Sequence, residues 1–163
     1  MITLREYRDS DVDRLVELAN NQAVSRFLVD SFPYPYTLDD ANWWIRTGSR
    51  RGITRVVELD GTFVGSVGAE PGAGEKRKQL GIGYWLGEKY WGKGITTKAL
   101  TMFADELFKT TDAERLQAWV YADNTASMRV LEKAGFAKDA VLRHALYKHG
   151  KLFDEHIYSR LRS

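Results

Sequence analysis

Residues Leu80–Thr97 read LGIGYWLGEKYWGKGITT and decide the fold. An apolar run interspersed with glycine ends at Leu86, and Gly92-Lys93-Gly94 precede the next element. Apolar residues then recur at helical spacing, namely Ile95, Ala99, Leu100, Phe103 and Leu107. The sequence therefore predicts a strand, a glycine loop and a helix in that order.

The glycine loop favours an anion site. Small residues at a strand-to-helix turn let several backbone N–H groups point into one space, and the helix N-terminus adds about half a positive charge. A phosphate or pyrophosphate suits such a site. Glycine also occurs in these turns for conformational reasons alone, so the loop by itself leaves both interpretations open.

Two nucleotide-binding motifs are excluded. The run from Gly87 to Gly94 fits G-x-x-x-x-G-K, but glycine replaces the Ser or Thr that holds magnesium in such loops. The dinucleotide fingerprint G-x-G-x-x-G fails as well, because Ile95-Thr96-Thr97 brings no third glycine.

The N-terminal third combines a strand with two helices. Ile2 to Tyr7 alternates like a strand, and Ser10 is expected to cap a first helix. The stretch from Ser31 to Tyr36, with two prolines among aromatic residues, is predicted as an ordered loop. Thr37 caps a second helix, whose predicted buried stripe is Leu38, Ala41, Trp44 and Ile45.

The remaining chain adds hairpins and one short helix. Asp60-Gly61 is a strong two-residue hairpin signal between two predicted strands. The other predicted elements are a strand over Arg115 to Tyr121, a helix over Asn124 to Ala134 and strands over about Phe136 to Tyr147 and Lys151 to Leu161. One strand-helix-strand crossover among hairpins indicates a single α/β (α+β) domain over residues 1–163. It has a mixed, mostly antiparallel sheet of about seven strands and about four helices on its faces.

Composition excludes several classes of function. The net charge of +2 over 163 residues is too small for a general nucleic-acid binder. The chain has no cysteine, which removes disulfides, thiolate metal sites and a cysteine nucleophile. No apolar run approaches the roughly 20 residues of a membrane span, and no signal-peptide core is seen. We expect a cytoplasmic protein that binds neither membrane nor nucleic acid, and we predict no metal.

A second group of polar residues lies in the segment from Asn124 to Ser127. Asn124 follows a strand, so it either caps the next helix or contacts a ligand. Ser127 shares a helix face with Val130, Leu131 and Ala134, which places its hydroxyl inward. A buried hydroxyl needs a partner, either the carbonyl one turn back or a ligand above the helix.

Together these motifs resemble the GNAT acetyltransferase superfamily, in particular its RimJ/RimL-type branch of ribosomal-protein N-terminal acetyltransferases. The resemblance covers nearly the whole chain, from the opening strand and the Phe32–Asp40 segment to the closing hairpin with Asp154. Its Q/R-x-x-G-x-G/A pattern falls on Trp91, Gly94 and Thr96, with departures at the first and last positions.

The resemblance implies an acetyl-CoA-dependent N-acetyltransferase acting on a primary amine, either a protein N-terminus or a small molecule. The backbone amides that it assigns to the CoA pyrophosphate are those of Trp91, Gly92, Lys93, Gly94, Ile95 and Thr96. The strand Tyr84-Trp85-Leu86 would pair with the pantetheine arm, Asn124 would hydrogen-bond it, and Ser127 would lie near the thioester sulfur. A homodimer is left open.

Proton transfer is where the sequence departs from its relatives. Many relatives have a tyrosine where this chain has Leu131, so the proton for the leaving thiolate falls to Ser127. Some N-terminal acetyltransferases carry a glutamate at the position of Leu146, and the candidates that replace it as base are Glu70 and His144. A place before a turn for Glu70, and packing or solvent exposure for His144, explain these two residues more simply. A weak base favours an acceptor of low pKa, such as a peptide α-amine.

Aromatic residues are expected to line the acceptor side, namely Phe32, Tyr34, Tyr36, Trp43 and Trp44, although such residues more often pack in the core or in a lid. The absent tyrosine and glutamate also allow a different class of protein, a non-catalytic module that senses acetyl-CoA or holds a partner. The inward hydroxyl of Ser127 favours the enzyme.

Overall fold

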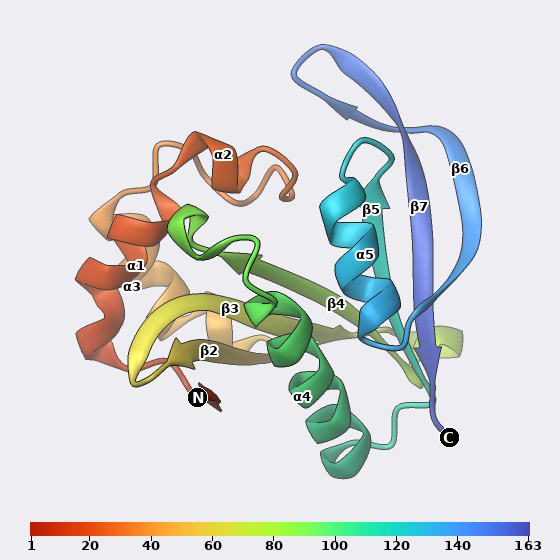
Figure 1. The fold of residues 1–163 in the computed structure, drawn as a ribbon, viewed down its shortest axis with the longest axis horizontal. Coiled ribbons are helices and arrows are strands. Elements are labelled where there is room, and N and C mark those ends of the chain that lie inside the picture. Colours follow the sequence, from red (N-terminus) through yellow and green to blue (C-terminus); the bar gives the residue numbers. More distant parts are fainter.

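The computed structural model describes residues 1–163 and arranges them around one seven-stranded sheet with helices on both faces (Figure 1). The strands are β1 (Ile2–Arg5), β2 (Ile53–Leu59), β3 (Thr62–Pro71), β4 (Gln79–Leu86), β5 (Arg115–Tyr121), β6 (Ala137–Lys148) and β7 (Lys151–Leu161). The helices are α1 (Val12–Ala19), α2 (Gln22–Ser25), α3 (Leu38–Arg46), α4 (Ile95–Thr110) and α5 (Thr125–Lys133). The predicted fold class is confirmed, with the four-residue α2 as an additional helix.

The order of strands is β1-β2-β3-β4-β5-β7-β6, and every neighbouring pair is antiparallel except β4 and β5. These two run parallel and are paired over only three positions, from Gln79–Arg115 to Gly81–Gln117. Beyond Gly81 the two strands diverge, and Figure 1 shows β4 and β5 leaving this point in different directions. The sheet is thus forked in its middle.

Local sequence signals produce the predicted turns and caps. Asp60 and Gly61 both adopt positive φ, of 50° and 81°, as a tight two-residue hairpin turn requires. Thr37 Oγ1 accepts a hydrogen bond from the Asp40 amide at 3.2 Å, and Asp40 Oδ2 accepts one from the Thr37 amide at 2.8 Å, which makes a capping box at the start of α3.

Two hydrophobic clusters fix the helices on the sheet. On one face α4 and α5 contribute Leu100, Phe103, Leu107 and Leu131, all fully buried. On the other face the cluster is formed by α1, α3 and the neighbouring strands with Leu15, Ala41, Ile45, Val56 and Phe63. Each large side chain buried in this way contributes about 1.5–3 kcal/mol to folding. The side of the sheet covered by α4 and α5 is called the α4 face, and the side covered by α1 and α3 is called the α3 face.

Three details differ from the sequence-based prediction. The first strand ends at Arg5 rather than Tyr7, and Ser10 does not cap α1. A 3-10 turn over Asp9–Asp11 precedes α1, and the Asp11 carboxylate accepts the Arg8 amide at 2.8 Å. Asp11 holds the N-cap position of α1, but its carboxylate bonds to no amide of that helix, because it accepts the Arg8 amide and two bonds of 2.8 Å from the Arg5 guanidinium. Leu38 is 54% exposed, so the buried stripe of α3 begins one turn later, at Ala41.

None of the helices has the length and apolar composition that crossing a membrane would require.

Candidate active site

The fork between β4 and β5 leaves peptide groups of β4 without strand partners. Gly87 N donates to Val64 O and Gly72 N donates to Gln79 O. Because antiparallel ladders alternate, odd-numbered residues of β4 bond to β3, and Tyr84 and Leu86 direct their peptide groups to the other side. There β5 has already diverged. The edge of β4 beyond Gly81 is therefore free to pair with an extended ligand.

The glycine loop ends beside this edge and carries further free donors. Gly92 and Gly94 adopt positive φ, of 73° and 75°, and Gly94 is the residue before the first turn of α4. The amides of Gly92, Lys93 and Gly94 donate no hydrogen bond within the molecule, and the first-turn amides of α4 have no intrahelical acceptors. Trp91 Nε1 donates to Leu86 O at 2.8 Å, which ties the loop to the end of β4.

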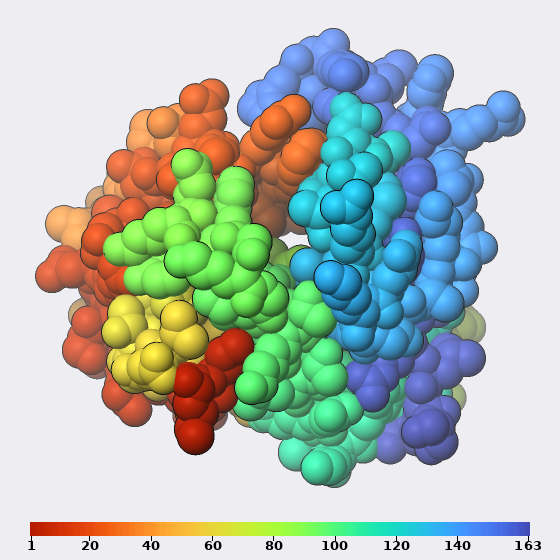
Figure 2. Space-filling model, in the orientation of Figure 1, coloured from red at the N-terminus to blue at the C-terminus, as the bar shows by residue number.

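The N-terminus of α5 lies across the gap from β4. Asn124 caps α5, because its Oδ1 accepts the Ser127 amide at 3.3 Å. The Ser127 hydroxyl does not bond to a carbonyl one turn back; it lies 2.5 Å from the Tyr84 hydroxyl of β4. Figure 2 shows a hollow between the residues leading into α4 and helix α5. The hydroxyl pair itself joins β4 to α5.

The hydroxyl pair is neutral at ordinary pH. Burial raises the pKa of Tyr84 to about 12, with the Ser127 hydrogen bond opposing that rise. Tyr84 thus keeps its proton and can donate it to Ser127. The sequence predicted a contact of Tyr84 with pantetheine through its backbone, but it did not predict a role for the Tyr84 hydroxyl. The signal was present, because Tyr84 alternates with glycine and shares the inward face with Ile82 and Leu86.

The α3 face of the fork is open and acidic. Gly81 and Gly83 are exposed, and a Cβ added to Gly83 would meet no atom within 4 Å. Glu70 of β3 lies opposite Gly81 on this face, is exposed and forms no ion pair or side-chain hydrogen bond. Trp119 of β5 is 37% exposed beyond the gap. Glycines thus leave room at the fork, with a carboxylate on one side and an aromatic ring on the other.

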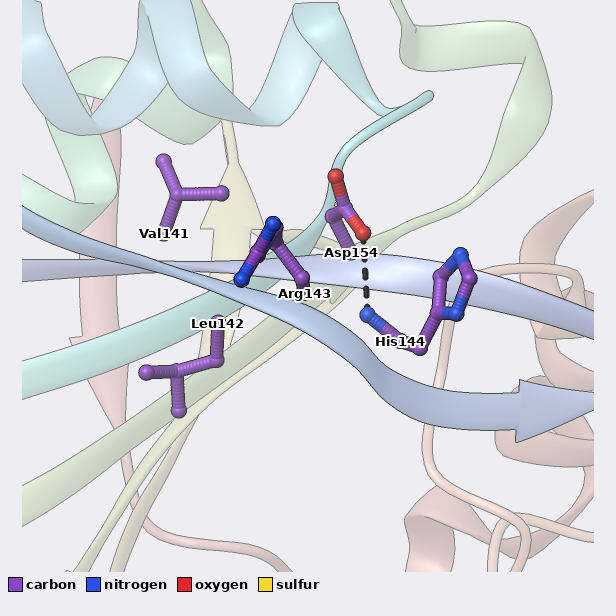
Figure 3. A pocket seen from close by; sticks show the side chains of 5 residues that line it. All are labelled: Val141, Leu142, Arg143, His144 and Asp154. Carbon is purple, nitrogen blue, oxygen red and sulfur yellow. Dashed lines mark hydrogen bonds between the residues drawn. The ribbon is translucent and has the colours of Figure 1, made fainter.

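The structure does not bring His144 to this group. His144 belongs to the edge strand β6, which β5 and β7 separate from β4. It interrupts the pairing of β6 with β7, adopts a φ of 52°, and its amide donates to Asp154 Oδ1 at 2.9 Å. Figure 3 shows it in an exposed depression with Val141, Leu142, Arg143 and Asp154.

The aromatic residues predicted for the acceptor side have mixed surroundings. Tyr36 is buried and its ring lies 5.3 Å from that of Phe32, which contacts Trp85 in turn. Trp44 packs edge-on against Tyr7. Tyr34 and Trp43 are about half exposed. Packing thus accounts for most of this group, and Phe32 and Tyr34 border a hollow beside α2.

Two faces meet at the fork, one lined by backbone amides and hydroxyls and the other by carboxylate and aromatic groups. The Acetyltransferase (GNAT) domain model matches residues 1–137. The chain therefore belongs to the GNAT acetyltransferase family, and its activity is N-acetyl transfer to an amine.

Individual relatives agree with this family. The N-acetyltransferase YoaA of Bacillus subtilis is 28% identical over 165 residues, covering 97% of this chain and 92% of its own. Spermidine N(1)-acetyltransferase of Escherichia coli is 26% identical over 154 residues, 92% of this chain and 80% of its own. The structure of RimL, a ribosomal L7/L12 α-N-protein acetyltransferase in complex with coenzyme A, superposes with a TM-score of 0.86 at 22% identity, over 98% of this chain and 93% of that one.

Proposed function

We propose that this enzyme transfers the acetyl group of acetyl-CoA directly to a primary amine, with acetyl-CoA bound in the gap between β4 and β5. One observation carries the proposal: the free amides at the start of α4 and the free edge of β4 adjoin each other and share one gap. The first is suited to a pyrophosphate and the second to an amide-containing chain such as pantetheine.

The amides of Gly92, Lys93, Gly94, Ile95 and Thr96 would hold the pyrophosphate. The Trp91 amide, which the sequence also assigned to this role, already donates to Glu88 O at 3.1 Å. Tyr84 would pair with pantetheine through its peptide N–H and C=O, and Leu86 through its N–H alone, because the Leu86 carbonyl already accepts Trp91 Nε1. Trp85 supports this contact indirectly, since its peptide group faces β3 and its ring packs on Phe63 at 6.3 Å. Asn124 caps α5 through Oδ1, which leaves its side-chain NH₂ free to donate to the ligand.

In the reaction the neutral amine attacks the thioester carbonyl, so that a C–N bond forms and the C–S bond breaks. A free β4 amide, that of Tyr84 or Leu86, would stabilise the oxyanion. The departing thiolate takes a proton from Ser127, and Tyr84 replaces that proton through the bond between their hydroxyls. The two hydroxyls would thereby protonate the thiolate, the function that a tyrosine has in many relatives at the position of Leu131. Leu131 itself is fully buried in the core.

Glu70 is the proposed acceptor of the amine's proton. It stands at the fork on the open face, opposite Gly81, where an amine reaches the gap without crossing the space between α4 and α5. Water between Glu70 and the amine would relay the proton. His144 has no such access, because two strands separate it from the fork.

The test is thiol release from acetyl-CoA with a panel of amines, including peptide N-termini, polyamines, amino acids and aminoglycosides. Amine-dependent release with a stoichiometric N-acetyl product supports the enzyme. Tight binding of acetyl-CoA without release under every acceptor would instead support a non-catalytic sensor. Gly94→Val is the matched variant, because its altered loop should weaken both binding and release.

A further inference from the structure

The closed end of the fork, where β4 and β5 are still paired, carries a polar group with no role so far. Arg115 is the first residue of β5 and pairs with Gln79, the first residue of β4. Each is followed by a leucine of the α4-face core, Leu80 or Leu116, so both side chains point to the α3 face. The Arg115 guanidinium therefore lies just before the point where the two strands part.

One guanidinium joins three strands at this end of the fork. Arg115 Nε donates to Gln79 Oε1 of β4 at 3.1 Å, and Arg115 Nη2 donates to Gln117 Oε1 of β5 at 2.8 Å. The same Nη2 lies 2.7 Å from Asp139 Oδ2 of β6, in an ion pair that spans the intervening strand β7. These four side chains are called the fork clamp.

An irregularity in β6 supplies the last member of the fork clamp. The strand pairs with β7 through Lys138–Tyr158 and then through Ala140–Ile157, so Asp139 is an extra residue in the ladder. A bulge of this kind directs a side chain away from the regular alternation of its strand. The pairing of β6 is therefore interrupted at the residue that reaches Arg115.

The backbone alone holds the fork weakly. The strands β4 and β5 share only three register pairs, in the parallel arrangement that is slightly less stable per residue than an antiparallel one. No register pair joins them beyond Gly81. Side-chain bonds across the first of these pairs thus resist a rotation of β4 relative to β5.

The angle between β4 and β5 decides whether the Tyr84–Ser127 hydroxyl pair forms. Tyr84 lies three residues beyond Gly81, which is about 10 Å along β4. Ser127 moves with β5 and β7, because α5 lies along them (Figure 1) and Glu132 Oε1 of α5 accepts the Tyr158 hydroxyl of β7 at 3.2 Å. A rotation of about 6° at Gly81 would shift Tyr84 by about 1 Å, and a misplacement of that size can cost about 100-fold in rate.

We propose that Arg115 is a positioning residue, which fixes the opening of the fork so that the Tyr84 and Ser127 hydroxyls meet. The inference rests on the proposed function and adds to it a residue that contacts neither reactant. The glycine loop follows β4 and is tied to it by the bond from Trp91 to Leu86. The groups that bind acetyl-CoA on the loop and on β4 therefore move together, so loss of the fork clamp affects the chemical step more than binding.

The experiment compares Arg115→Ala with Arg162→Ala by thiol release from acetyl-CoA, using an amine that the wild type acetylates. Arg162 is the matched control, because its side chain is 29% exposed against 30% for Arg115 and its guanidinium donates three bonds of 2.7–2.8 Å. Its acceptors are carbonyls of α4 and of the loop after it, away from the fork. Both variants should lower the Tm by about 2–6 °C.

The two variants should differ in turnover. Arg115→Ala should lower kcat about 10- to 30-fold and keep the KM for acetyl-CoA within about twofold of the wild-type value. Arg162→Ala should keep the wild-type kcat. Gln79→Leu cuts the β4 arm of the fork clamp alone and should give a smaller loss of kcat with the same unchanged KM.

A second comparison separates positioning from a general loss of folded enzyme. In a Ser127→Ala background, Arg115→Ala should lower kcat by no more than about a further twofold, because the hydroxyl pair that it positions is already absent. The inference is overturned if Arg115→Ala keeps the wild-type kcat, or if it lowers kcat equally with and without Ser127. Absence of thiol release by the wild type with every amine would instead contradict the proposed function itself, on which the inference rests.

Discussion

The two faces of the fork differ in the kind of group that they present. On the α4 face the groups are backbone amides and the neutral hydroxyls of Tyr84 and Ser127. On the α3 face they are the carboxylates of Glu70 and Glu155 with the ring of Trp119 between them. The first face suits an anionic cosubstrate and the second a cationic acceptor. In the proposed reaction, the fork would thus keep the anionic cosubstrate and the cationic amine on opposite sides of one sheet until they meet at the gap.

The largest effect is expected from the hydroxyl pair. Ser127→Ala removes the proposed proton donor to the thiolate, and we expect kcat to fall about 100-fold with little change in the KM for acetyl-CoA. Tyr84→Phe should cost nearly as much, because Ser127 loses the hydrogen-bond partner at 2.5 Å. The double variant should be hardly slower than either single variant, since the two act as one unit. Additive losses would contradict the shared proton route.

The Tyr84–Ser127 hydroxyl pair also predicts how kcat depends on pH. Since burial raises the pKa of Tyr84 to about 12, the phenol stays protonated across the working range. Wild-type kcat should therefore show no falling limb from this group below pH 10.

On the other face, Glu70→Gln should lower kcat/KM by roughly 100-fold at pH 7 for an amine of pKa near 10, because the neutral amine then depends on a base. The loss should shrink as the pH rises toward the amine's own pKa. His144→Gln is the matched control on the edge strand and should remain at the wild-type rate. Wild-type rates for Glu70→Gln between pH 6 and 9 would remove Glu70 from the mechanism.

A smaller effect is expected in the glycine loop. Gly94 has a φ of 75°, and a β-branched residue there costs about 1–2 kcal/mol or shifts the loop. Gly94→Val should raise the KM for acetyl-CoA about tenfold and leave the selectivity among amines unchanged. Gly61→Val also changes a glycine of positive φ, but in the distant β2–β3 hairpin. It should lower thermal stability without changing that KM.

These regions also differ in how far the sequence alone could predict them. Asp60-Gly61, Thr37 and the apolar stripe of α4 specify their structures through contacts a few residues apart, and all three were confirmed. The bond between Tyr84 and Ser127 joins residues 43 positions apart and depends on how far β4 and β5 diverge. Glu155 reaches its aromatic surroundings only through the register of β7 with β5, which no local pattern encodes.

The smallest expected effect is on the stability of the protein and comes from Glu155 on the α3 face. Because burial raises the pKa of Glu155, folding favours its protonated form. The folded state therefore loses stability as the pH rises from the ordinary value of 4.5 through the raised one, and near pH 4 the carboxyl is largely protonated in both states. Glu155→Gln should match the wild-type Tm at pH 4 and exceed it by roughly 1–3 °C at pH 7. A lower Tm at pH 7 would mean that a cation of the protein already pairs with Glu155.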